Sequence, residues 1–422
     1  MTERRSPVNS DADPTPIGSI PPLGEVPRRM HAQVVRPSRY GEPATAFEAE
    51  VVDVPDIGPD EVLIAVMAAG INYNNVWAAR GYPVDQVAVR QKQGEPEDFH
   101  IGGSDLSGIV YAVGDAVPNI GVGDEVVVHH GWWLPDDPWV QAGKDPMLSN
   151  SARIWGYDTN FGSFGQFSRA QAHQVMPRAE RLTWEEAAAP TLVGTTAYRM
   201  LYGWEPNIVQ PDDVVLVWGG SGGLGSQAVQ LARHAGAQAV AVVSDDERGQ
   251  YAQKLGAVGW INRRDYDHWG IPPRVDDAAG QKEWAAGARA FGKKLSEILG
   301  ARKDPGIVFE HPGQDTIPTS IYLCATGGMV VICAGTTGYD AVVDLRYHWT
   351  RQKRLQGSHG TNDEQANRYN DLVRAGEIDP CLGKVRPFTE IAAAHEAMAR
   401  GEEVFGNTVC LVGAAEPGTG RK

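Results

Sequence analysis

A strand, a glycine-rich turn and a helix follow one another near the middle of the chain, and this pattern constrains the fold most. Residues 214–217 are consecutive apolar residues, which predicts a buried parallel strand. Leu224, Ala228 and Leu231 then recur at helical spacing. Glycines let a backbone approach a pyrophosphate, and a helix N-terminus offers free N–H groups and a positive dipole. The pattern predicts a dinucleotide site rather than a turn without a ligand. Its expected contacts are Gly219, Ser221, Gly222, Gly223, Leu224 and Gly225.

Strands and helices alternate on the C-terminal side of this turn. Apolar strands are expected at 239–243, 307–310 and 328–333, with a polar, partly helical insertion at about 264–300. On the N-terminal side, from about 31 to 200, short strands and turns dominate. The alternation predicts a βα arrangement for the C-terminal part of the chain only.

These patterns predict an α/β protein with two domains. A doubly wound parallel sheet is expected at 205–350. A β-rich domain is expected at 30–204 together with 351–422, because the alternation stops in the tail. Within it, Thr183 and Glu186 have the spacing of a capping box that opens a helix. His129 and His130 follow a predicted strand and are expected to be loop residues.

Composition argues against several functions. The formal net charge of the 422 residues is −15, which disfavours nucleic acids and anionic membranes as partners. The four cysteines lack metal-ligand spacing, so no metal is expected, and no apolar run reaches the ~18 residues that span a bilayer. Residues 1–29 are rich in proline, serine and charge, which predicts a disordered leader rather than a signal peptide. A cytoplasmic protein fits these observations.

Several longer strings carry a family resemblance. They are residues 70–72, 102–108, 123–126, 153–160, 182–189, 261–265, 309–313, 333–339 and 356–359. Together with the glycine turn they resemble the crotonyl-CoA carboxylase/reductase family, in its alkylmalonyl-CoA-forming branch. That family lies in the medium-chain dehydrogenase/reductase superfamily, and the lack of any cysteine before Cys324 indicates its zinc-free part. The resemblance implies a GroES-like β-rich catalytic domain and a Rossmann domain that binds NADPH.

The choice of cofactor depends on the end of the second nucleotide-binding strand. Ser244 stands there, where NAD-selective enzymes place an acid that accepts from the ribose 2′-hydroxyl. Arg248 and Arg263 can meet a 2′-phosphate bidentately, which favours NADPH, although both could be surface charges. The resemblance places His311 in the loop on the nicotinamide side. Ala334, Gly335 and Thr336 complete the expected cofactor contacts.

The resemblance implies a reductive carboxylation. NADPH reduces the β-carbon of an enoyl thioester, and CO2 captures the enolate without a metal or biotin. A dry pocket with a few fixed polar donors favours this capture. The family's CO2 contacts map onto His359, onto Tyr157 with Asp158, and onto Asn72 or Asn74. The two asparagines share a strand face if the backbone is extended, and Asp158 is one methylene shorter than the expected glutamate.

Two features predict how the substrate is held. Cations before His359 could bind the phosphates of CoA, although a solvated face is the alternative: Arg346, Arg351, Lys353 and Arg354. Gly165 stands where alanine is expected and Gly360 where phenylalanine is expected. The lost phenyl group frees on the order of 100 Å³, which predicts a pocket for longer, branched or aromatic 2-enoyl-CoA. The product would be an alkylmalonyl-CoA of the kind that polyketide synthases use.

Two other functions remain open at this point. An enoyl-CoA or quinone reductase with the same cofactor would only protonate the enolate, and Asp158 and Gly360 favour it. A catalytically silent nucleotide-binding protein is the other alternative, and the intact glycine turn and His359 argue against it. A homodimer or homotetramer is expected, because relatives pair through the edge strands of the Rossmann sheet.

Overall fold

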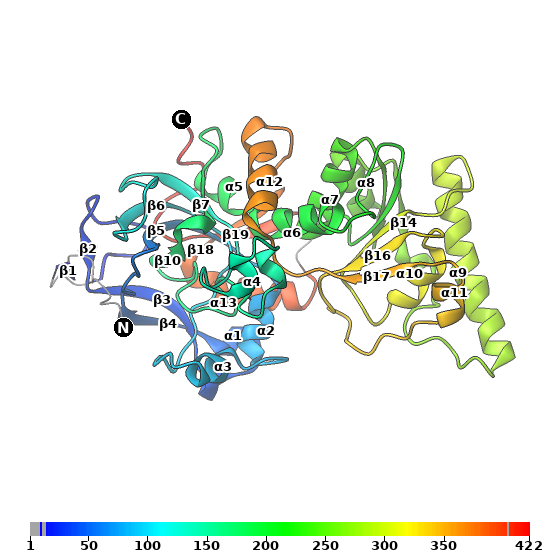
Figure 1. The fold of residues 1–422 in the computed structure, drawn as a ribbon, viewed down its shortest axis with the longest axis horizontal. Helices are drawn as coiled ribbons and strands as arrows, with labels where there is room; N and C mark the ends of the chain where they lie inside the picture. Colours follow the sequence, from blue (N-terminus) through cyan, green and yellow to red (C-terminus); the bar gives the residue numbers. More distant parts are fainter. Residues whose placement is uncertain (1–8, 11–13, 403–404) are drawn as a thin grey trace. The chain divides into compact units, whose positions relative to one another are not determined.

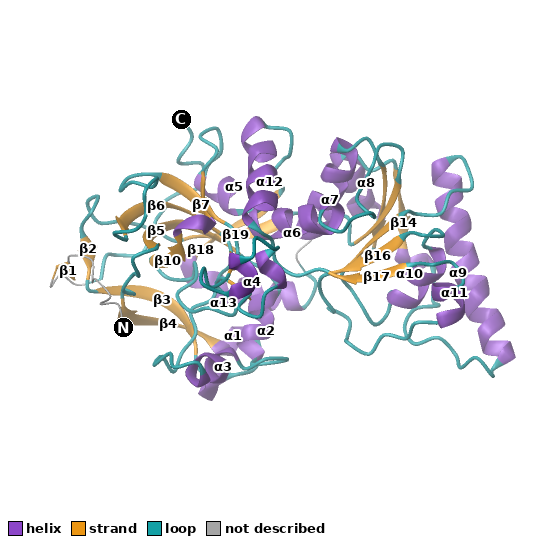
Figure 2. Cartoon of the chain, in the orientation of Figure 1, coloured by secondary structure: helices purple, strands orange, loops and turns teal. Residues whose placement is uncertain are grey.

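In the computed structural model the chain forms two compact units, and the structure describes residues 9–10, 14–402 and 405–422. Unit 1 runs up to Thr195 and takes up the chain again at 360–376 and 380–422. Unit 2 comprises 196–359 and 377–379. The boundaries between the units therefore lie at Thr195/Thr196 and His359/Gly360. The sequence pattern predicted these boundaries at 204/205 and 350/351. Figure 1 follows the elements along the chain, and Figure 2 separates helices from strands.

Unit 2 is built on a six-stranded sheet whose paired strands are all parallel. Its order is β14-β13-β12-β15-β16-β17, which is the order of a doubly wound dinucleotide-binding sheet. The strands are β12 (Val214–Trp218), β13 (Gln238–Val243), β14 (Gly259–Asn262), β15 (Ile307–Glu310), β16 (Met329–Ile332) and β17 (Arg354–Gly357). This sheet confirms the α/β fold class.

Helices cover both faces of this sheet, α7 and α8 on one side and α9 to α11 on the other (Figure 1). They are α7 (Gly223–His234), α8 (Asp246–Leu255), α9 (Ala278–Leu299), α10 (Ile317–Leu323) and α11 (Leu345–Trp349). The polar insertion is mostly α9, whose Phe291 and Leu295 pack on Trp218 and Val240 of the sheet. Burial on both faces explains why β12 is apolar throughout rather than alternating.

Unit 1 is built on a mainly antiparallel sheet of seven strands. Its order is β11-β7-β6-β5-β19-β18, with β10 paired to β5. The strands are β5 (Glu61–Gly70), β6 (Leu106–Val113), β7 (Glu125–Val128), β10 (Phe167–Gln171), β11 (Val175–Pro177), β18 (Leu382–Pro387) and β19 (Asn407–Leu411). β19 lies antiparallel to β5, with Val409 opposite Gly70, so the end of the chain completes the sheet begun near its start.

Short ribbons and helices surround this sheet. The ribbons are β3 (Arg29–Val35) with β4 (Phe47–Asp53), β8 (Gly131–Trp132) with β9 (Arg153–Ile154), and β1 (Asn9–Ser10) with β2 (Val26–Pro27). The helices are α1 (Pro43–Ala46), α2 (Asn74–Arg80), α3 (Gln86–Lys92), α4 (Pro138–Gln141), α5 (Trp184–Ala188), α12 (Asp363–Ala375) and α13 (Ile391–Ala399). The predicted capping box is confirmed at the start of α5: Glu186 N–H donates to Thr183 Oγ1 at 3.2 Å, and Thr183 N–H donates to Glu186 at 2.8 Å. α6 (Thr191–Tyr202) carries the chain from unit 1 into unit 2.

Residues 14–29 correct the expectation of a disordered leader. Gly18 N–H donates to Val412 O at 2.9 Å, and Tyr111 Oη donates to Pro21 O at 2.6 Å. Ile20 packs against the core of unit 1. The prolines favour an extended path, and up to Glu25 this path has no helix or strand yet packs on unit 1. Residues 1–8 and 11–13 of the expected leader lie outside the described residues.

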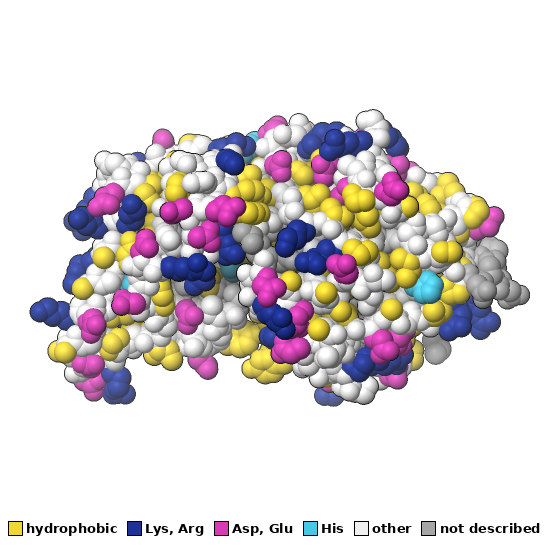
Figure 3. Space-filling model, turned by 180° about the vertical axis from the view of Figure 1, so that it is seen from behind, with side chains coloured by type: hydrophobic (Ala, Val, Ile, Leu, Met, Phe, Trp, Pro, Cys, Tyr) yellow, Lys and Arg dark blue, Asp and Glu magenta, His cyan; other side chains and the backbone are white. Residues whose placement is uncertain are grey.

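The surface mixes charges of both signs. On the face drawn in Figure 3, lysine and arginine side chains lie interspersed with acidic ones, with hydrophobic and uncharged areas between them. Among the described residues, no helix combines the length and the apolar character needed to cross a membrane.

Candidate active site

The glycine turn of unit 2 has the close approaches that a dinucleotide site requires. Gly219 has a φ of +64°, and a Cβ there would lie 2.4 Å from Nε2 of His311. A Cβ on Gly225 would lie 2.2 Å from the carbonyl oxygen of Gly219. Only glycine lets the start of α7 lie this close to the turn. Gly222 caps α7 without a side-chain hydrogen bond, so its first N–H groups can bind an anion.

Ser244 and Arg263 lie together at the carboxyl edge of the sheet. They directly follow Val243 and Asn262, which are register partners on β13 and β14. Arg248 Nη1 donates to Ser244 Oγ at 2.8 Å, which places its guanidinium over the same edge. The expected 2′-phosphate contacts therefore share one edge of unit 2, with Arg263 exposed.

Asp245 does not take the position of a ribose-binding acid. Its Oδ1 accepts from Arg248 N–H at 2.9 Å and so caps α8. This backbone hydrogen bond lowers the pKa of Asp245 below its usual value. The other oxygen of Asp245, Oδ2, lies 3.5 Å from Nε of Arg248, so the two side chains form an ion pair at the end of β13.

His311 connects the glycine turn with the loop after β16. Its ring faces Gly219, and its carbonyl accepts from Thr336 N–H at 3.3 Å. Burial lowers the pKa of His311 to about 4, so the ring is neutral near pH 7. The expected contact residues Gly219, His311 and 334–336 thus lie together at the ends of β12, β15 and β16.

Sequence reasoning missed the buried carboxyl group beside His311. Glu310 Oε1 accepts from Thr316 Oγ1 at 2.5 Å, and its Oε2 accepts from Ser320 Oγ at 2.6 Å. Ser320 in turn accepts from Trp218 Nε1 at 2.9 Å, so the network reaches the residue before the glycine turn. Burial raises the pKa of Glu310 to about 7, although the hydroxyl groups favour its ionised form. Because apolar residues precede Glu310, the sequence pattern predicted only a buried core strand and did not indicate a polar network at this carboxyl group.

The cations expected to hold CoA phosphates do not form one free cluster. Lys353 is 5% exposed and donates to the carbonyls of Ile321 and Tyr322, at 2.5 and 3.3 Å. Burial lowers its pKa to about 8. The expectation for Lys353 is therefore wrong, because its side chain turns inward to satisfy main-chain carbonyls.

The three arginines near Lys353 each have partners within unit 2. Arg354 Nη1 donates to the carbonyls of Trp204 and Glu205, at 3.1 and 3.0 Å. Arg346 binds Asp344 at 2.6 Å and is 51% exposed. Arg351 lies 3.8 Å from Asp304 and is 48% exposed. Arg346 and Arg351 thus keep the exposure that an anion contact needs.

The two asparagines of unit 1 differ in environment. Asn72 is 4% exposed, and its Nδ2 donates to Asp105 Oδ2 at 2.7 Å. Asn74 is half-buried and donates to Ser104 Oγ at 2.9 Å. They do not share a strand face, since α2 begins at Asn74 and the extended backbone ends before it. Asn72 therefore holds Asp105 in place, whereas Asn74 is the more exposed of the two asparagines.

Tyr157 and Asp158 form a turn directly after β9. Tyr157 is buried in an apolar cluster with Ala78, Trp133, Met147 and Ile154. Asp158 Oδ2 accepts from Ile154 N–H at 2.7 Å, and Oδ1 accepts from Gln86 Nε2 at 3.1 Å. The carboxylate of Asp158 thus accepts the hydrogen bond that closes the turn in which it lies. Because Ala78 belongs to α2, the cluster brings Tyr157 to the helix that Asn74 begins.

His359 is the last residue of unit 2 and precedes Gly360 directly. It is exposed, and it follows Ser358, whose Oγ accepts from Trp204 Nε1 at 3.2 Å. Its role in catalysis rests on the resemblance.

Comparisons with known proteins identify the family. Residues 58–180 match the family model described as alcohol dehydrogenase GroES-like domain, and residues 223–375 match the one described as zinc-binding dehydrogenase. A crotonyl-CoA carboxylase/reductase of Cereibacter sphaeroides is 49% identical over 402 residues, which are 95% of this chain and 92% of the relative. The chain belongs to the crotonyl-CoA carboxylase/reductase family.

Solved structures agree with this assignment. The crotonyl-CoA carboxylase/reductase AntE in complex with NADP has a TM-score of 0.92 at 52% identity and covers 96% of this chain and 100% of its own. The 2-octenoyl-CoA carboxylase reductase CinF, with NADP and 2-octenoyl-CoA, has a TM-score of 0.85 at 34% identity and covers 94% and 91%. The GroES-like and Rossmann architecture expected of the family is therefore confirmed.

Gly165 and Gly360, at which an enlarged pocket was expected, do not leave empty space. A Cβ on Gly360, whose φ is +71°, would lie 2.3 Å from Cε of Met147 and 3.2 Å from Cδ1 of Ile154. A Cβ on Gly165 would lie 3.0 Å from Cε of Met30. The expectation of an open pocket at these positions is wrong, because methionines from distant parts of the chain fill the volume.

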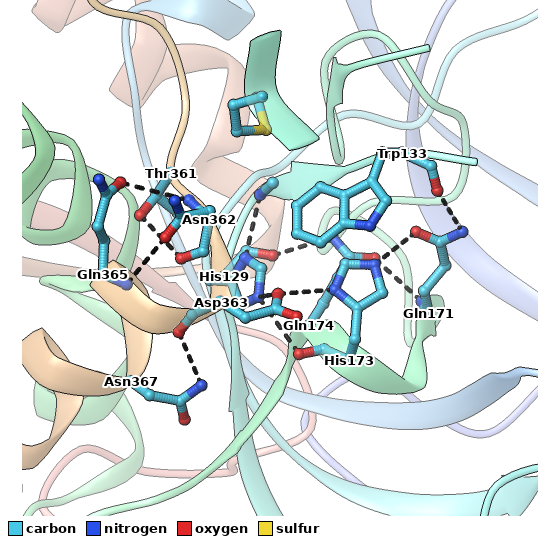
Figure 4. Close-up of polar contacts among 12 residues, drawn as sticks. His129, Trp133, Gln171, His173, Gln174, Thr361, Asn362, Asp363, Gln365 and Asn367 are labelled. Atoms are coloured by element: carbon cyan, nitrogen blue, oxygen red, sulfur yellow. Dashed lines mark hydrogen bonds and ion pairs between the residues drawn. The ribbon is translucent and has the colours of Figure 1, made fainter. Parts of the chain in front are cut away.

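A further cluster in this family member was not expected from its sequence. His129, His173 and Asp363 place one nitrogen or oxygen each within 4.8 Å of one another (Figure 4). His129 lies in the loop that directly follows β7, as expected, and its side chain is fully buried. The three positions come from separate parts of the chain, so no spacing within the sequence signals the cluster.

Proposed function

We propose that this enzyme reduces a 2-enoyl-CoA with NADPH and adds CO2 to the α-carbon, which gives an alkylmalonyl-CoA. The observation that carries the proposal is the similarity over 95% of the chain to a crotonyl-CoA carboxylase/reductase. The glycine turn, with its bare helix start and neighbouring Arg248, supports the cofactor part.

The residues of unit 2 fit NADPH in two respects. The close approaches at Gly219 and Gly225 form a cradle that any Cβ would fill, and the first N–H groups of α7 suit a pyrophosphate. Arg248 and Arg263 would hold the 2′-phosphate. When bound, NADPH supplies a hydride to the β-carbon of the enoyl thioester. Neutral His311 adds no charge beside the glycine turn.

The residues of unit 1 decide what happens to the enolate. A neutral gas needs fixed, weakly interacting donors rather than a charged group. The half-buried amide of Asn74, held by Ser104, is such a donor, and we assign the family's asparagine contact to it rather than to Asn72. Tyr157 with Asp158 is the other proposed CO2 contact in unit 1. The resemblance adds His359, the last residue of unit 2.

A reductase without carboxylation is the second candidate function, and one observation favours it. Both carboxylate oxygens of Asp158 already accept hydrogen bonds from within unit 1, at 2.7 and 3.1 Å. An acid so engaged holds a CO2 molecule less readily than a longer, freer glutamate does.

Isotope incorporation separates the two functions. The purified enzyme would be supplied with NADPH, enoyl-CoA and 13C-bicarbonate, and the masses of the products would be measured by mass spectrometry. One 13C per NADPH consumed is the expected result. Saturated acyl-CoA without 13C, formed at the same rate with and without bicarbonate, would contradict carboxylation and support the reductase.

The acyl group is proposed to be longer than crotonyl, or branched or aromatic. Met147 occupies the space next to Gly360, and an unbranched thioether side chain adapts its shape readily. Arg346 and Arg351 are proposed to hold the CoA phosphates. Kinetics with a series of enoyl-CoAs test this, and a strong preference for crotonyl-CoA would contradict the longer chain.

A homo-oligomer is also proposed. β17 is the edge strand of the unit 2 sheet, and Leu355 in it is 41% exposed. An exposed edge strand is a template for pairing with a second copy. Light scattering after size-exclusion chromatography gives the mass in solution, and a monomer at micromolar concentration would contradict this proposal.

A further inference from the structure

Asp363 accepts hydrogen bonds from two histidines that lie far from it in the sequence. Nε2 of His129 lies 3.0 Å from Asp363 Oδ1, and Nδ1 of His173 lies 2.8 Å from the same oxygen (Figure 4). His129 follows β7, His173 lies in a 3-10 turn between β10 and β11, and Asp363 is the first residue of α12. All three residues belong to unit 1.

The proton positions at this cluster follow from its neighbours. Nε2 of His173 lies 2.8 Å from Oε1 of Gln171, whose amide orientation is set because its Nε2 donates to Trp133 O at 3.0 Å. Both ring nitrogens of His173 therefore lie at hydrogen-bond distance from side-chain oxygens of Asp363 and Gln171. Burial would raise the pKa of Asp363, but the hydrogen bonds from His129 and His173 hold it well below its usual value.

His129 is neutral, and its tautomer argues against a metal ion at this cluster. Its Nδ1 accepts from Gly131 N–H at 3.2 Å, so its proton is on Nε2 and points at Asp363. Burial also lowers the pKa of His129. A metal ion on Nε2 would require the proton to be on Nδ1, where it would point at another donor, the N–H of Gly131. Metal-ligating histidines instead donate from their second ring nitrogen to an acceptor. The cluster is therefore held by hydrogen bonds from the two histidines to Asp363.

The ring of His173 reaches the apolar cluster that holds Tyr157. Trp133 stacks on it with ring centroids 4.1 Å apart and an angle of 28°. Stacked aromatic rings at this distance stabilise each other. Trp133 belongs to the same buried cluster as Tyr157, Met147 and Ile154. Asp363, His173 and Trp133 thus form a continuous line of contacts to the Tyr157 cluster.

The start of α12 is fixed to the same cluster from the other side. The Cα of Gly131 lies against the carbonyl of Thr361, since a Cβ there would be 2.0 Å from that oxygen. Gly360 touches Met147 and Ile154. A shift of Asp363 would therefore disturb both the Trp133 side and the Gly360 side of the Tyr157 turn.

We propose that Asp363 and His173 are positioning residues that hold Trp133 against the Tyr157–Asp158 turn and thereby set the share of enolate that is carboxylated. The proposal rests on the reductive carboxylation proposed above. It concerns the partition between CO2 capture and protonation, and reduction by NADPH does not depend on it.

Asp363→Asn tests the proposal, because it keeps the shape of the side chain and removes the charge that pairs with His173. The matched control is Glu364→Gln, the next residue of α12, whose exposed carboxylate pairs with Arg368 at 2.9 Å. Both changes remove one negative charge from the first turn of the helix, so their effects on the helix dipole are similar. His173→Phe keeps a ring over Trp133 and removes its hydrogen bonds.

Three quantities would be measured for each full-length variant: the ratio of 13C-carboxylated to reduced product, the apparent KM for CO2 and the rate of NADPH oxidation. In Asp363→Asn and His173→Phe we expect the product ratio to fall on the order of tenfold and the KM for CO2 to rise. NADPH oxidation should stay within about twofold of wild type, and Glu364→Gln should behave as wild type.

The outcomes separate this proposal from the function on which it rests. A wild-type product ratio in soluble, cooperatively melting Asp363→Asn would overturn the positioning role alone, and equal losses in Glu364→Gln would also do so. A wild-type enzyme that incorporates no 13C would instead overturn the carboxylation. A melting temperature that EDTA lowers in wild type but not in Asp363→Asn would show a bound metal and would overturn the hydrogen-bonded assignment.

Discussion

Gly225 in unit 2 and Gly360 in unit 1 both lie against a close neighbour, but the neighbours differ in kind. A Cβ on Gly225 would meet a backbone carbonyl at 2.2 Å, whereas a Cβ on Gly360 would meet the methyl end of Met147 at 2.3 Å. A carbonyl in a tight turn cannot move without moving the turn, while a thioether side chain can change rotamer. The cofactor turn is therefore rigid, and the wall beside Gly360 is adaptable.

The largest effect is expected from Gly225→Ala, which tests the rigid side of this comparison. The methyl group would push α7 away from Gly219 and separate its N–H groups from the pyrophosphate, so NADPH affinity should fall about 100-fold. Fluorescence titration with NADPH measures it. Gly306→Ala in the same unit is the control, because a Cβ there would lie 3.9 Å from Asp213 Oδ1, an ordinary contact. Near-wild-type affinity in Gly225→Ala would show that the turn adapts.

Low pH should destabilise the protein through His311, whose ring lies over Gly219. Burial lowers the pKa of His311 to about 4, against about 6.5 in an unfolded chain. As pH falls from about 6.5 to about 4, the unfolded state binds this proton and the folded state does not, so the free energy of unfolding falls by up to about 3 kcal/mol. Urea unfolding at several pH values should show a smaller loss in His311→Asn. An identical pH dependence in the variant would mean that the ring takes up its proton while folded.

The contrast between the two glycines also explains which features could be predicted from the sequence. The roles of Gly219 and Gly225 follow from a local strand–turn–helix rule, as does the capping box at Thr183, because the residues that interact are neighbours in the chain. The space beside Gly360 depends on Met147, more than two hundred residues earlier, and local patterns do not report such contacts.

The same limit applies to charged groups. Lys353 was predicted as a phosphate ligand from its neighbours in sequence, but the carbonyls of α10 that bind it are set by the packing of the whole unit. The Asp363 cluster joins three distant segments and leaves no local signal. Chemistry carried by one segment was predictable here, and chemistry assembled by tertiary packing was not.

Arg248→Ala should change cofactor preference while leaving the glycine turn intact. The guanidinium would lose its charge-assisted hydrogen bonds to a 2′-phosphate, which contribute about 1.5 to 3 kcal/mol. The ratio of kcat/KM for NADPH to that for NADH should fall about 10- to 100-fold, mainly through KM for NADPH. Steady-state kinetics with both cofactors measures this ratio. An unchanged ratio would assign the discrimination to Arg263 instead.

Met147→Ala should have the smallest effect and tests the adaptable side. Removing the thioether opens space between Gly360 and Ile154, so kcat/KM for octenoyl-CoA relative to crotonyl-CoA should rise about threefold to tenfold. Met30→Ala is the comparison, since Met30 faces Gly165 from within the apolar core of unit 1 and is fully buried. It should lower the free energy of unfolding by about 2 to 5 kcal/mol without changing the preference between substrates. If Met147→Ala also leaves the preference unchanged while destabilising the protein, then Met147 is a core residue like Met30, and the wall beside Gly360 does not face the acyl chain.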